Sequence, residues 1–421
     1  MEVIADFHIH SKYSRATSQD MDLEHLYFWA KRKGVNLLGT GDFTHPAWLK
    51  ELKEKLIPTE EGLYKLKNQD NDFFFRFIIT GEISLIYSFQ GKTRKIHYLL
   101  ILPNLETAEK INTQLSWLGN LSADGRPILG INSQEFLKII LSTSREVILV
   151  PAHIWTPWFG IFGSKSGFNS LEECFGNLSQ EIFSMETGLS ADPAMCWRLS
   201  SLDRTTLISN SDAHSPKKIA REANVFEIEK EKINFSEIRR IIKEKDRKNF
   251  LLTIEFYPEE GKYHFDGHRQ CQVSFPPKET KKYNGLCPVC QRPLTIGVLS
   301  RVEELADREE NFLPKNRIPF KKIVPLEEII TQVLHQSSLG KEGEMFYNKL
   351  IDSFGNEMNI LLKSEIKEIE KTTLPEIAQG IERVRKGEVF IQPGFDGQFG
   401  KISLWQLEEK EKKENFQSTL F

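Results

Sequence analysis

The sequence has little cysteine, and it has no hydrophobic run that approaches the length of a membrane span. Its five cysteines are an odd number, and two of them, Cys287 and Cys290, form a Cys-x-x-Cys. Both facts favour a reduced compartment over a disulfide-bonded, secreted protein. The first residues also lack the features of a signal peptide. We therefore expect a cytoplasmic protein that does not enter a membrane.

A strong charge of either sign is missing as well. The formal net charge is −3 at pH 7, which excludes a protein that binds polyanions over its whole surface. The average conceals one basic stretch, because residues 262–300 contain six Lys or Arg and two acidic residues. We expect contacts with nucleic-acid phosphates in that region.

A His-x-His triplet follows the first apolar run. Side chains alternate along a strand, so His8 and His10 point to the same face and form half of a chelate. A pair of solvated or core histidines is the alternative. Later apolar runs supply further ligand types near their ends: Asp42, Glu82, His97, His153, Glu186, and Asp212 with His214. Most of these runs are separated by helix-like segments, which predicts an α/β barrel with its active site on one rim.

The candidate ligands are imidazoles and carboxylates, without thiolates. This set suits two or three divalent ions such as Zn²⁺, Mn²⁺, Fe²⁺ or Mg²⁺. Two ions a few ångströms apart can activate a water and stabilise the leaving oxygen of a phosphoester. The ligands themselves therefore indicate phosphoester hydrolysis.

A second group of ligands has the spacing of a structural zinc ribbon. His268-x-x-Cys271 is followed by Cys287-x-x-Cys290, and each pair is typical of a knuckle that converges on one ion. Four ligands leave no open position, so we expect one structural Zn²⁺. His264 is a competing first ligand, and unmetalled cytosolic cysteines are the alternative.

The segment after His153 is rich in aromatic residues and glycine. One interpretation is a hydrophobic plug over the barrel. The other is a DNA-binding wall on which a nucleobase stacks while nearby polar groups reach phosphate. The residues in question are Trp155, Trp158, Phe159, Ser164, Lys165 and Ser166.

The metal motifs resemble those of the PHP (polymerase and histidinol phosphatase) superfamily. They are His8-x-His10, Asp42, Glu82, His97, His153 and Asp212-x-His214, in order over residues 1–225. The resemblance implies a PHP-type distorted (β/α)7 barrel with three metal ions. Two departures exist: Phe43 replaces the usual histidine after Asp42, which leaves His45 as an alternative ligand, and Ser14–Thr17 stands where a further histidine is common.

The succession of barrel, zinc ribbon and small helical domain resembles endonuclease Q over nearly the whole chain. The densest matches are residues 6–11, 39–42, 154–168, 210–215, 266–290 and 393–397. The resemblance implies a DNA repair endonuclease in which metal-activated water cleaves the phosphodiester 5′ to uracil, hypoxanthine, xanthine or an abasic site, with the damaged nucleotide flipped out. Glu186 or Asp192 would be a ligand or the general base. A phosphatase for a small phosphomonoester such as histidinol phosphate, or a non-catalytic scaffold, are the alternatives.

At 421 residues the chain is too long for one such barrel. We expect the PHP barrel at 1–225, a connector and the zinc ribbon at 226–300, a helical DNA-binding domain at 301–405, and a charged linker with a tail at 406–421. We expect the whole to act as a monomer.

The chain ends in Gln417-Ser-Thr-Leu420-Phe421, which resembles the short peptides that dock bacterial proteins on the DNA sliding clamp. Leu420 and Phe421 would fill an apolar pocket, and Gln417 would form a hydrogen bond at its edge. Such peptides act at the end of a flexible tether, and a charged linker precedes this one.

Deleting residues 417–421 should abolish binding to a bacterial sliding clamp, since these residues supply the docking contacts. A single peptide contact of this kind is weak, with a Kd of about 1 μM or roughly −8 kcal/mol. Calorimetric titration of the clamp with both proteins measures the loss. A melting temperature several degrees lower, with no clamp binding by the full chain, would instead make Leu420 and Phe421 core residues.

Overall fold

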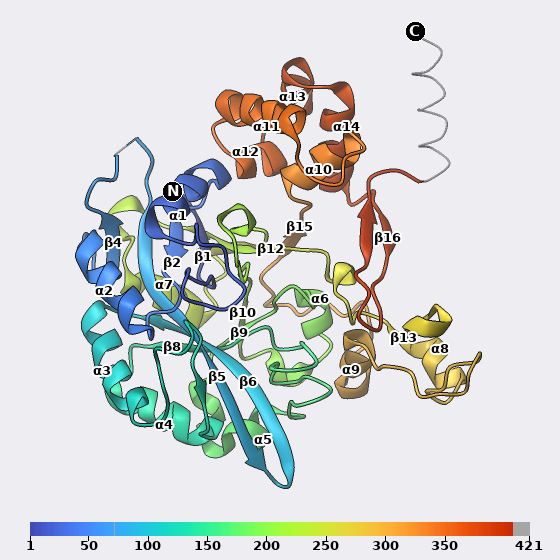
Figure 1. The fold of residues 1–421 in the computed structure, drawn as a ribbon, viewed down its shortest axis with the longest axis horizontal. Helices are drawn as coiled ribbons and strands as arrows, with labels where there is room; N and C mark the ends of the chain where they lie inside the picture. The colour runs from blue at the N-terminus through green and yellow to red at the C-terminus, as the bar shows by residue number, and fades with distance from the viewer. Residues whose placement is uncertain (71, 407–421) are drawn as a thin grey trace.

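The computed structural model describes residues 1–70 and 72–406, and the predicted tail lies outside this part. Its main body is mixed α/β, built on an eleven-stranded mixed sheet (Figure 1). The strands are β1 (Glu2–Asp6), β2 (Leu37–Gly39), β3 (Leu56–Pro58), β4 (Leu63–Leu66), β5 (Arg76–Phe89), β6 (Lys92–Leu102), β7 (Ile128–Leu129), β8 (Ile148–Pro151), β11 (Ala223–Glu227), β12 (Phe250–Glu255) and β15 (Phe320–Lys322).

The strand order places the ends of distant segments around one region. The sheet runs β15-β12-β11-β1-β2-β5-β4-β3, with β6 and β7 also on β5 and β8 on β6. A separate parallel pair, β9 (Ser184–Glu186) and β10 (Thr206–Ile208), lies beside it. Hydrogen bonds join this pair to the segments that follow β8 and β1 of the sheet. Ile154 N, after β8, donates to Glu186 O at 3.1 Å, and Phe7 N, after β1, donates to Asn210 Oδ1 at 2.9 Å.

Most helices of the main body begin at polar side chains that accept a hydrogen bond from a first-turn N–H. Asp22, Asn104, Asn132, Ser170 and Asn234 each do so, which satisfies one donor that the helix leaves unpaired. The helices are α1 (Leu23–Lys33), α2 (Pro46–Lys55), α3 (Leu105–Ser116), α4 (Ser133–Thr143), α5 (Leu171–Phe175), α6 (Pro193–Cys196) and α7 (Phe235–Glu244).

The position of Glu82 differs from the expectation that the ligands lie at the ends of strands. Glu82 lies in the middle of β5, which continues to Phe89 and pairs with β6 from Ile79 opposite Leu102 to Phe89 opposite Lys92. The cause is the sequence after Glu82, where buried Ile83, Leu85 and Tyr87 keep the alternation of a strand. Figure 1 shows the result as a long hairpin.

The ribbon region forms a small unit at one side of the body. It contains β13 (Asp266–His268), paired antiparallel with β14 (Val273–Phe275), and the helices α8 (Pro277–Lys282) and α9 (Val298–Leu305). Its buried apolar cluster comprises only Val273, Cys287 and Leu294. So small a core needs another source of stability, as a bound metal supplies.

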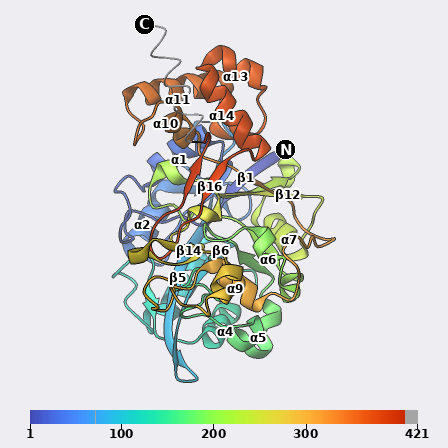
Figure 2. The same ribbon diagram turned by 90° about the vertical axis from the view of Figure 1, so that its right-hand side faces the viewer.

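The last described segment is helical and ends in a hairpin. It holds α10 (Leu326–Val333), α11 (Lys341–Phe354), α12 (Glu357–Leu362), α13 (Ile366–Thr372), α14 (Pro375–Lys386), β16 (Phe390–Gln392) and β17 (Lys401–Ser403). Figures 1 and 2 show these helices beyond one end of the α/β body, with the hairpin reaching back toward the ribbon. Before the helices begin, β15 joins the main sheet beside β12.

A buried ion pair joins the helical segment to the body. Lys33 Nζ on α1 lies 2.7 Å from Glu357 Oε2 on α12, and both side chains are almost fully buried. Glu357 also accepts hydrogen bonds from Tyr347 Oη at 2.8 Å and from Leu326 N at 3.1 Å. Because its carboxylate is satisfied on several sides, the pair fixes the docking of α12 on α1.

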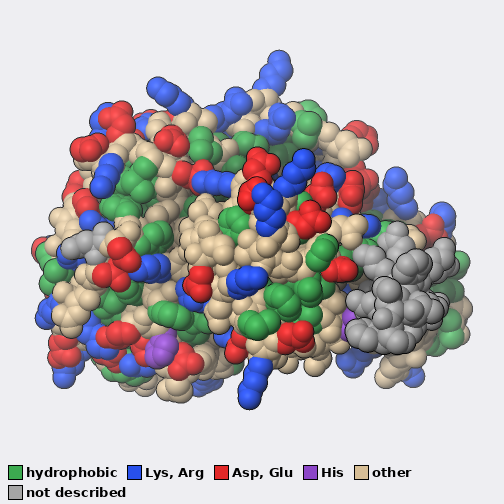
Figure 3. Space-filling model, turned by 90° about the horizontal axis from the view of Figure 1, so that it is seen from above, with side chains coloured by type: hydrophobic (Ala, Val, Ile, Leu, Met, Phe, Trp, Pro, Cys, Tyr) green, Lys and Arg blue, Asp and Glu red, His purple; other side chains and the backbone are tan. Residues whose placement is uncertain are grey.

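The surface over the helical segment is mixed in charge. Figure 3 shows Lys and Arg interspersed with Asp and Glu on this face. Among the described residues, no helix combines the length and apolar character that a bilayer crossing requires.

Candidate metal centre

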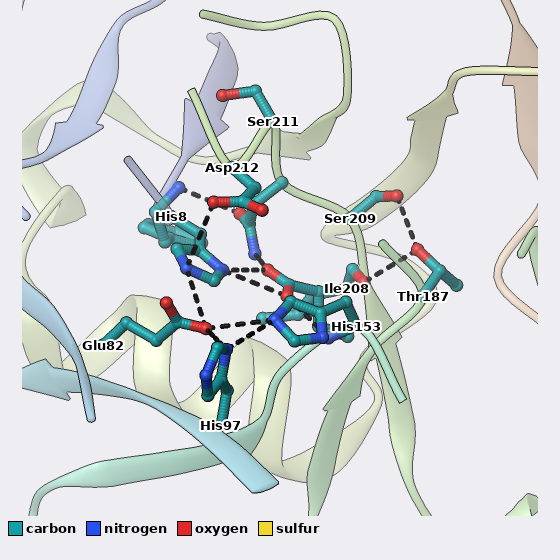
Figure 4. Close-up of polar contacts among 12 residues, drawn as sticks. His8, Glu82, His97, His153, Thr187, Ile208, Ser209, Ser211 and Asp212 are labelled. Carbon is teal, nitrogen blue, oxygen red and sulfur yellow. Dashed lines mark hydrogen bonds and ion pairs between the residues drawn. The ribbon is translucent and has the colours of Figure 1, made fainter. Parts of the chain in front are cut away.

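Seven of the eight predicted catalytic ligands meet in one place. Figure 4 shows His8, Glu82, His97, His153 and Asp212 with their side chains directed toward one another. Among the described residues, this place contains three groups whose ligand atoms lie within 4.8 Å of one another: His8, His10 and Glu82; Glu82, His97 and His153; and His10, Asp212 and His214.

The Glu82 carboxylate belongs to two of these groups. Its Oε1 lies 2.7 Å from His97 Nδ1 and 3.0 Å from His153 Nε2. Its Oε2 lies 3.4 Å from His10 Nε2. One carboxylate with an oxygen toward each group has the arrangement of a bridge between two ions.

His8 shows that the groups fit a metal ion. Its Nδ1 lies 3.0 Å from both oxygens of Glu186, which leaves Nε2 to face the cluster. There the fully buried Nε2 has no hydrogen-bond partner among the described residues. The carboxylate oxygens that face His8 Nε2 lie 3.6 Å away (Glu82 Oε1) and 3.9 Å away (Asp212 Oδ1). A buried imidazole nitrogen facing carboxylates without bonding them is a donor suited to Zn²⁺ or Mn²⁺.

Asp42, the eighth predicted ligand, lies behind the cluster and belongs to none of the three groups. Its Oδ1 lies 3.0 Å from His10 Nδ1, while Oδ2 accepts hydrogen bonds from Ser11 N at 2.6 Å and Ser14 Oγ at 2.9 Å. His45 is also outside the groups, and its ring stacks on Tyr13 at 4.5 Å. Asp42 and Glu186 thus orient the two imidazoles of His-x-His from their outer nitrogens.

Three residues of the site hold strained backbone conformations. Asp42 (φ 46°), His153 (φ 31°) and Asp212 (φ 47°) lie in the left-handed region, which L-residues avoid. Gly188 packs so closely that a Cβ there would lie 2.4 Å from His153 Cβ. Such strain collects at sites where side-chain direction matters more than local stability.

The ionisation of the cluster prepares it for cations. Burial disfavours charge on His8 and His10, but the carboxylates beside them raise the pKa of both well above the ordinary value. Burial prevails at His97 and lowers its pKa to about 4. The cations around Glu82 and Asp212 outweigh burial and lower the pKa of both. At neutral pH the acids are ionised and His97 is neutral, so ions that bind displace protons from His8 and His10.

The two predicted general bases occupy different positions. Glu186 accepts from His153 N and Asn210 Nδ2, both at 2.8 Å, besides its contact with His8. Asp192 caps α6 by accepting from Met195 N, and it pairs with Lys322 Nζ at 2.9 Å. Neither Glu186 nor Asp192 belongs to a ligand group among the described residues.

The aromatic segment is divided between core and surface. Trp155 is fully buried and donates to Cys196 Sγ, so it packs as part of the core. Trp158 is 40% exposed, and the Phe159 ring stacks on His97 with centroids 4.2 Å apart. An exposed aromatic surface therefore adjoins a candidate ligand.

The polar residues of that segment are divided in the same way. Ser166 is buried and bonds within the fold, accepting from Phe159 N and donating to Lys95 O. Ser164 Oγ is buried and has no hydrogen-bond partner among the described residues, whereas Lys165 is exposed. Of the three, Lys165 is therefore the residue that a ligand can reach.

The four ribbon ligands also converge. The ligand atoms of His268, Cys271, Cys287 and Cys290 lie within 4.8 Å of one another. His264, the competing candidate, is buried against Phe265 and belongs to no ligand group. Three sulfurs and one imidazole form the donor set of a structural zinc site.

Sequence reasoning assigned no role to two residues at the centre. Arg126 Nη1 lies 2.9 Å from Glu82 Oε2; Arg126 stands outside the His-x-His and strand-end patterns, so only the fold brings it to the site. Asp6 ends β1 directly before the His-x-His triplet. Its carboxylate accepts hydrogen bonds from the backbone of Ser211 and Ala220, which shapes the loop that carries Asp212.

Comparisons with known proteins place the chain in a family. A family model described as the MJ0043 C-terminal domain matches residues 325–388. The chain is 34% identical over 266 residues to MJ0043 of Methanocaldococcus jannaschii, described as uncharacterized. The match covers 61% of this chain and 32% of that protein, so it spans about a third of this relative. YqxK of Bacillus subtilis, also described as uncharacterized, is 28% identical over 421 residues, covering 95% of this chain and 99% of that protein.

Two solved structures match nearly the whole fold. The lesion-specific endonuclease PfuEndoQ from Pyrococcus furiosus has 30% identity and a TM-score of 0.84, covering 98% of this chain and 99% of that chain. The chain belongs to the endonuclease Q family. An endonuclease Q complex with a 27-mer duplex substrate that carries an abasic lesion at the active site has 30% identity and a TM-score of 0.83, covering 96% and 97%.

Membership of the endonuclease Q family agrees with the sequence resemblance and with the α/β architecture around a mixed sheet. The likeness extends through the ribbon and the C-terminal helices, because it covers nearly all of both chains.

The shared position of Glu82 predicts an unequal loss of metal. Glu82→Gln should lower the catalytic metal content more than His97→Ala, because Glu82 serves two ligand groups and His97 one. Elemental analysis of each purified protein measures the difference. His25→Ala is the matched control, since His25 lies half exposed on α1. Equal losses, in proteins that are folded by circular dichroism, would contradict a shared carboxylate.

The ribbon assignment predicts a separate loss of zinc and of thermal stability. Cys287→Ser should remove about one zinc per chain and lower the melting temperature, because the ion supplies much of the stability of so small a unit. Cys174→Ser is the control, a buried cysteine outside every ligand group. Unchanged zinc in Cys287→Ser would refute the ribbon assignment.

Proposed function

We propose that the chain is a metal-dependent DNA repair endonuclease that hydrolyses the phosphodiester on the 5′ side of a deaminated base or an abasic site. The observation that carries the proposal is the likeness over nearly the whole chain to a lesion-specific endonuclease. A phosphatase for a small phosphomonoester has no need of a ribbon or a helical segment. A related structure holds duplex DNA with an abasic lesion at its active site.

In this proposal the seven strands β1, β2, β5, β6, β8, β9 and β10 form a PHP-type barrel. Support comes from the bonds that link the separate pair to the sheet on both sides, at Ile154 and at Phe7. Ile9 and Ala213 add a parallel bridge beyond Phe7. The loops after β1, β8 and β10 then carry His10, His153 and Asp212 to the same rim.

The three ligand groups would hold two or three catalytic divalent ions, with Glu82 shared between two of them. Ions bound there supply Lewis acidity and lower the pKa of a nearby water. The ribbon would hold one structural Zn²⁺ through His268 and the three cysteines.

The chain's own residues prepare this site. Glu186 holds His8 and Asp42 holds His10, so Nε2 of each ring faces the cluster. Phe159 packs on His97 and restricts the access of water to that ligand. Since Glu186 has direct contact with a ligand and Asp192 has none, Glu186 is the stronger candidate for proton transfer.

The DNA would lie along the exposed aromatic surface beside the centre. Trp158 would offer its face to a flipped base, and the exposed Lys165 would reach a phosphate. The Ser164 hydroxyl is buried and would need a local rearrangement to join it. The ribbon and the helical segment would contact the flanking duplex through its backbone. The sliding clamp, through residues 417–421, is the further partner, and the protein acts as a cytoplasmic monomer.

The test compares substrates in one assay. End-labelled duplexes that contain uracil, hypoxanthine, xanthine or an abasic analogue should be cut on the 5′ side of the lesion, and an undamaged duplex should remain intact. A chelator should abolish cleavage, and added Mn²⁺ or Zn²⁺ should restore it. Release of phosphate from histidinol phosphate, with every duplex intact, would support the phosphatase instead.

A further inference from the structure

A loop that the ligand motifs do not include lies against the centre. Residues 124–127 are the last part of the connection between α3 and the short strand β7, and Arg126 from this loop pairs with Glu82 Oε2 at 2.9 Å. The Arg126 side chain is 28% exposed, whereas Glu82 is fully buried. The guanidinium therefore stands between the ligand groups and solvent.

The protein fixes this loop through bonds on both sides of Arg126. Gly125 N donates to Tyr13 O at 3.0 Å, and Ser84 N donates to Pro127 O at 3.0 Å. Thr44 Oγ1 donates to Gly125 O at 3.1 Å. These contacts come from three separate segments of the body, so the loop is held rigidly.

Gly125 shows how closely the loop approaches the centre. A Cβ at this position would lie 2.3 Å from Asp42 Oδ2 and 2.4 Å from Ser14 Oγ. Only glycine lets the backbone pass so near to the carboxylate that orients His10. The close approach places Arg126 beside the ligands.

The Arg126 guanidinium retains unused donors. A guanidinium carries five N–H groups in a planar fork, and among the described residues its side-chain hydrogen bonds are limited to the one with Glu82. Arg221, also near the site, differs because its Nε and Nη2 donate to the backbone carbonyls of Ser211 and Asp212. Arg126 thus keeps more unused donors than Arg221 among the described residues.

We propose that Arg126 binds a non-bridging oxygen of the scissile phosphate and is a catalytic residue of the reaction proposed above, on which this inference rests. During hydrolysis the water oxygen forms a bond to phosphorus, and the bond from phosphorus to one ester oxygen breaks. That oxygen takes up a proton, and the water gives up one. Arg126 keeps its proton throughout and stabilises the negative charge that gathers on the phosphoryl oxygens.

A different role would be to position Glu82 alone. The two roles predict different outcomes for metal content. If Arg126 only orders Glu82, its removal lowers the occupancy of the ions, and activity falls with occupancy. If Arg126 binds phosphate, its removal leaves the ions in place and weakens the binding of phosphate itself.

The experiment uses the full-length, metal-loaded protein and the variants Arg126→Ala and Arg126→Lys. Arg240→Ala is the matched control. Arg240 also pairs with a carboxylate, Glu237, but it lies on α7, which packs at the start of β10 and not at the end that carries Asp212. Four quantities are measured: metal content, kcat on a uracil duplex, binding of inorganic phosphate by calorimetry, and rescue by added guanidinium.

For Arg126→Ala we expect unchanged metal content, a fall in kcat of roughly 100-fold or more, and weaker binding of inorganic phosphate. Added guanidinium should restore part of the activity of Arg126→Ala and none of the activity of a ligand variant. Arg126→Lys should keep more activity than Arg126→Ala but less than the unaltered protein, because an ammonium lacks the fork. Arg240→Ala should behave like the unaltered protein.

Loss of metal in Arg126→Ala in proportion to its loss of activity would overturn the proposal, and so would unchanged phosphate binding. If the unaltered protein cuts none of the duplexes, the proposed function fails. The phosphate titration still decides the role of Arg126, because it needs no cleavage.

Discussion

The buried Glu82 carboxylate is the constraint on which the rest of the centre depends. A fully buried negative charge is costly unless cations and donors surround it. Here His97, His153, His10 and Arg126 supply that environment. Each comes from a different part of the chain, so the carboxylate is stable only when the strands and loops that carry them are in place.

The register of the long hairpin makes this arrangement specific. Glu82 pairs with Leu99, and His97 pairs with Ser84, so Glu82 and His97 share one face at a diagonal spacing. A slip of one residue would turn one of them to the opposite face. The apolar residues that extend β5 beyond Glu82 therefore also fix the centre, although they do not touch it.

Much of the centre could be predicted because its ligands follow local rules. The alternation of side chains predicts that His8 and His10 share one face. The spacing of the ribbon cysteines predicts that they converge on one ion. The position of Arg126 could not be predicted, because it rests on bonds to Tyr13, Thr44 and Ser84 that only the tertiary fold creates.

Other errors of position have the same origin. Sequence shows that Asp42 and Trp155 are near important residues, but it does not show which side of a neighbour they contact. Asp42 meets the outer nitrogen of His10, and Trp155 turns into the core. Glu82 was expected at a strand end, although the alternating Ile83, Leu85 and Tyr87 after it carry β5 on to Phe89 along β6.

Hydrogen bonds connect the ribbon region to the aromatic segment beside the candidate metal centre. Arg301 on α9 is buried and donates to Phe162 O at 3.0 Å and to Phe168 O at 3.1 Å in the aromatic segment. The Arg94 guanidinium lies over the Phe168 ring at 4.1 Å. Two arginines thus hold the segment that follows His153, so a distortion near the ribbon reaches the exposed aromatic surface beside the centre.

The left-handed backbone at Asp42 and Asp212 has a consequence for how such a protein can change over generations. Asparagine adopts this conformation at least as readily as aspartate, and glycine more readily still, whereas most other residues are penalised. Exchange to Asn at both positions would remove two charges yet preserve the chain path. A descendant that carried both amides would therefore keep these two turns of the backbone while it lost the negative charge at Asp212, a candidate ligand, and at Asp42, the partner of His10.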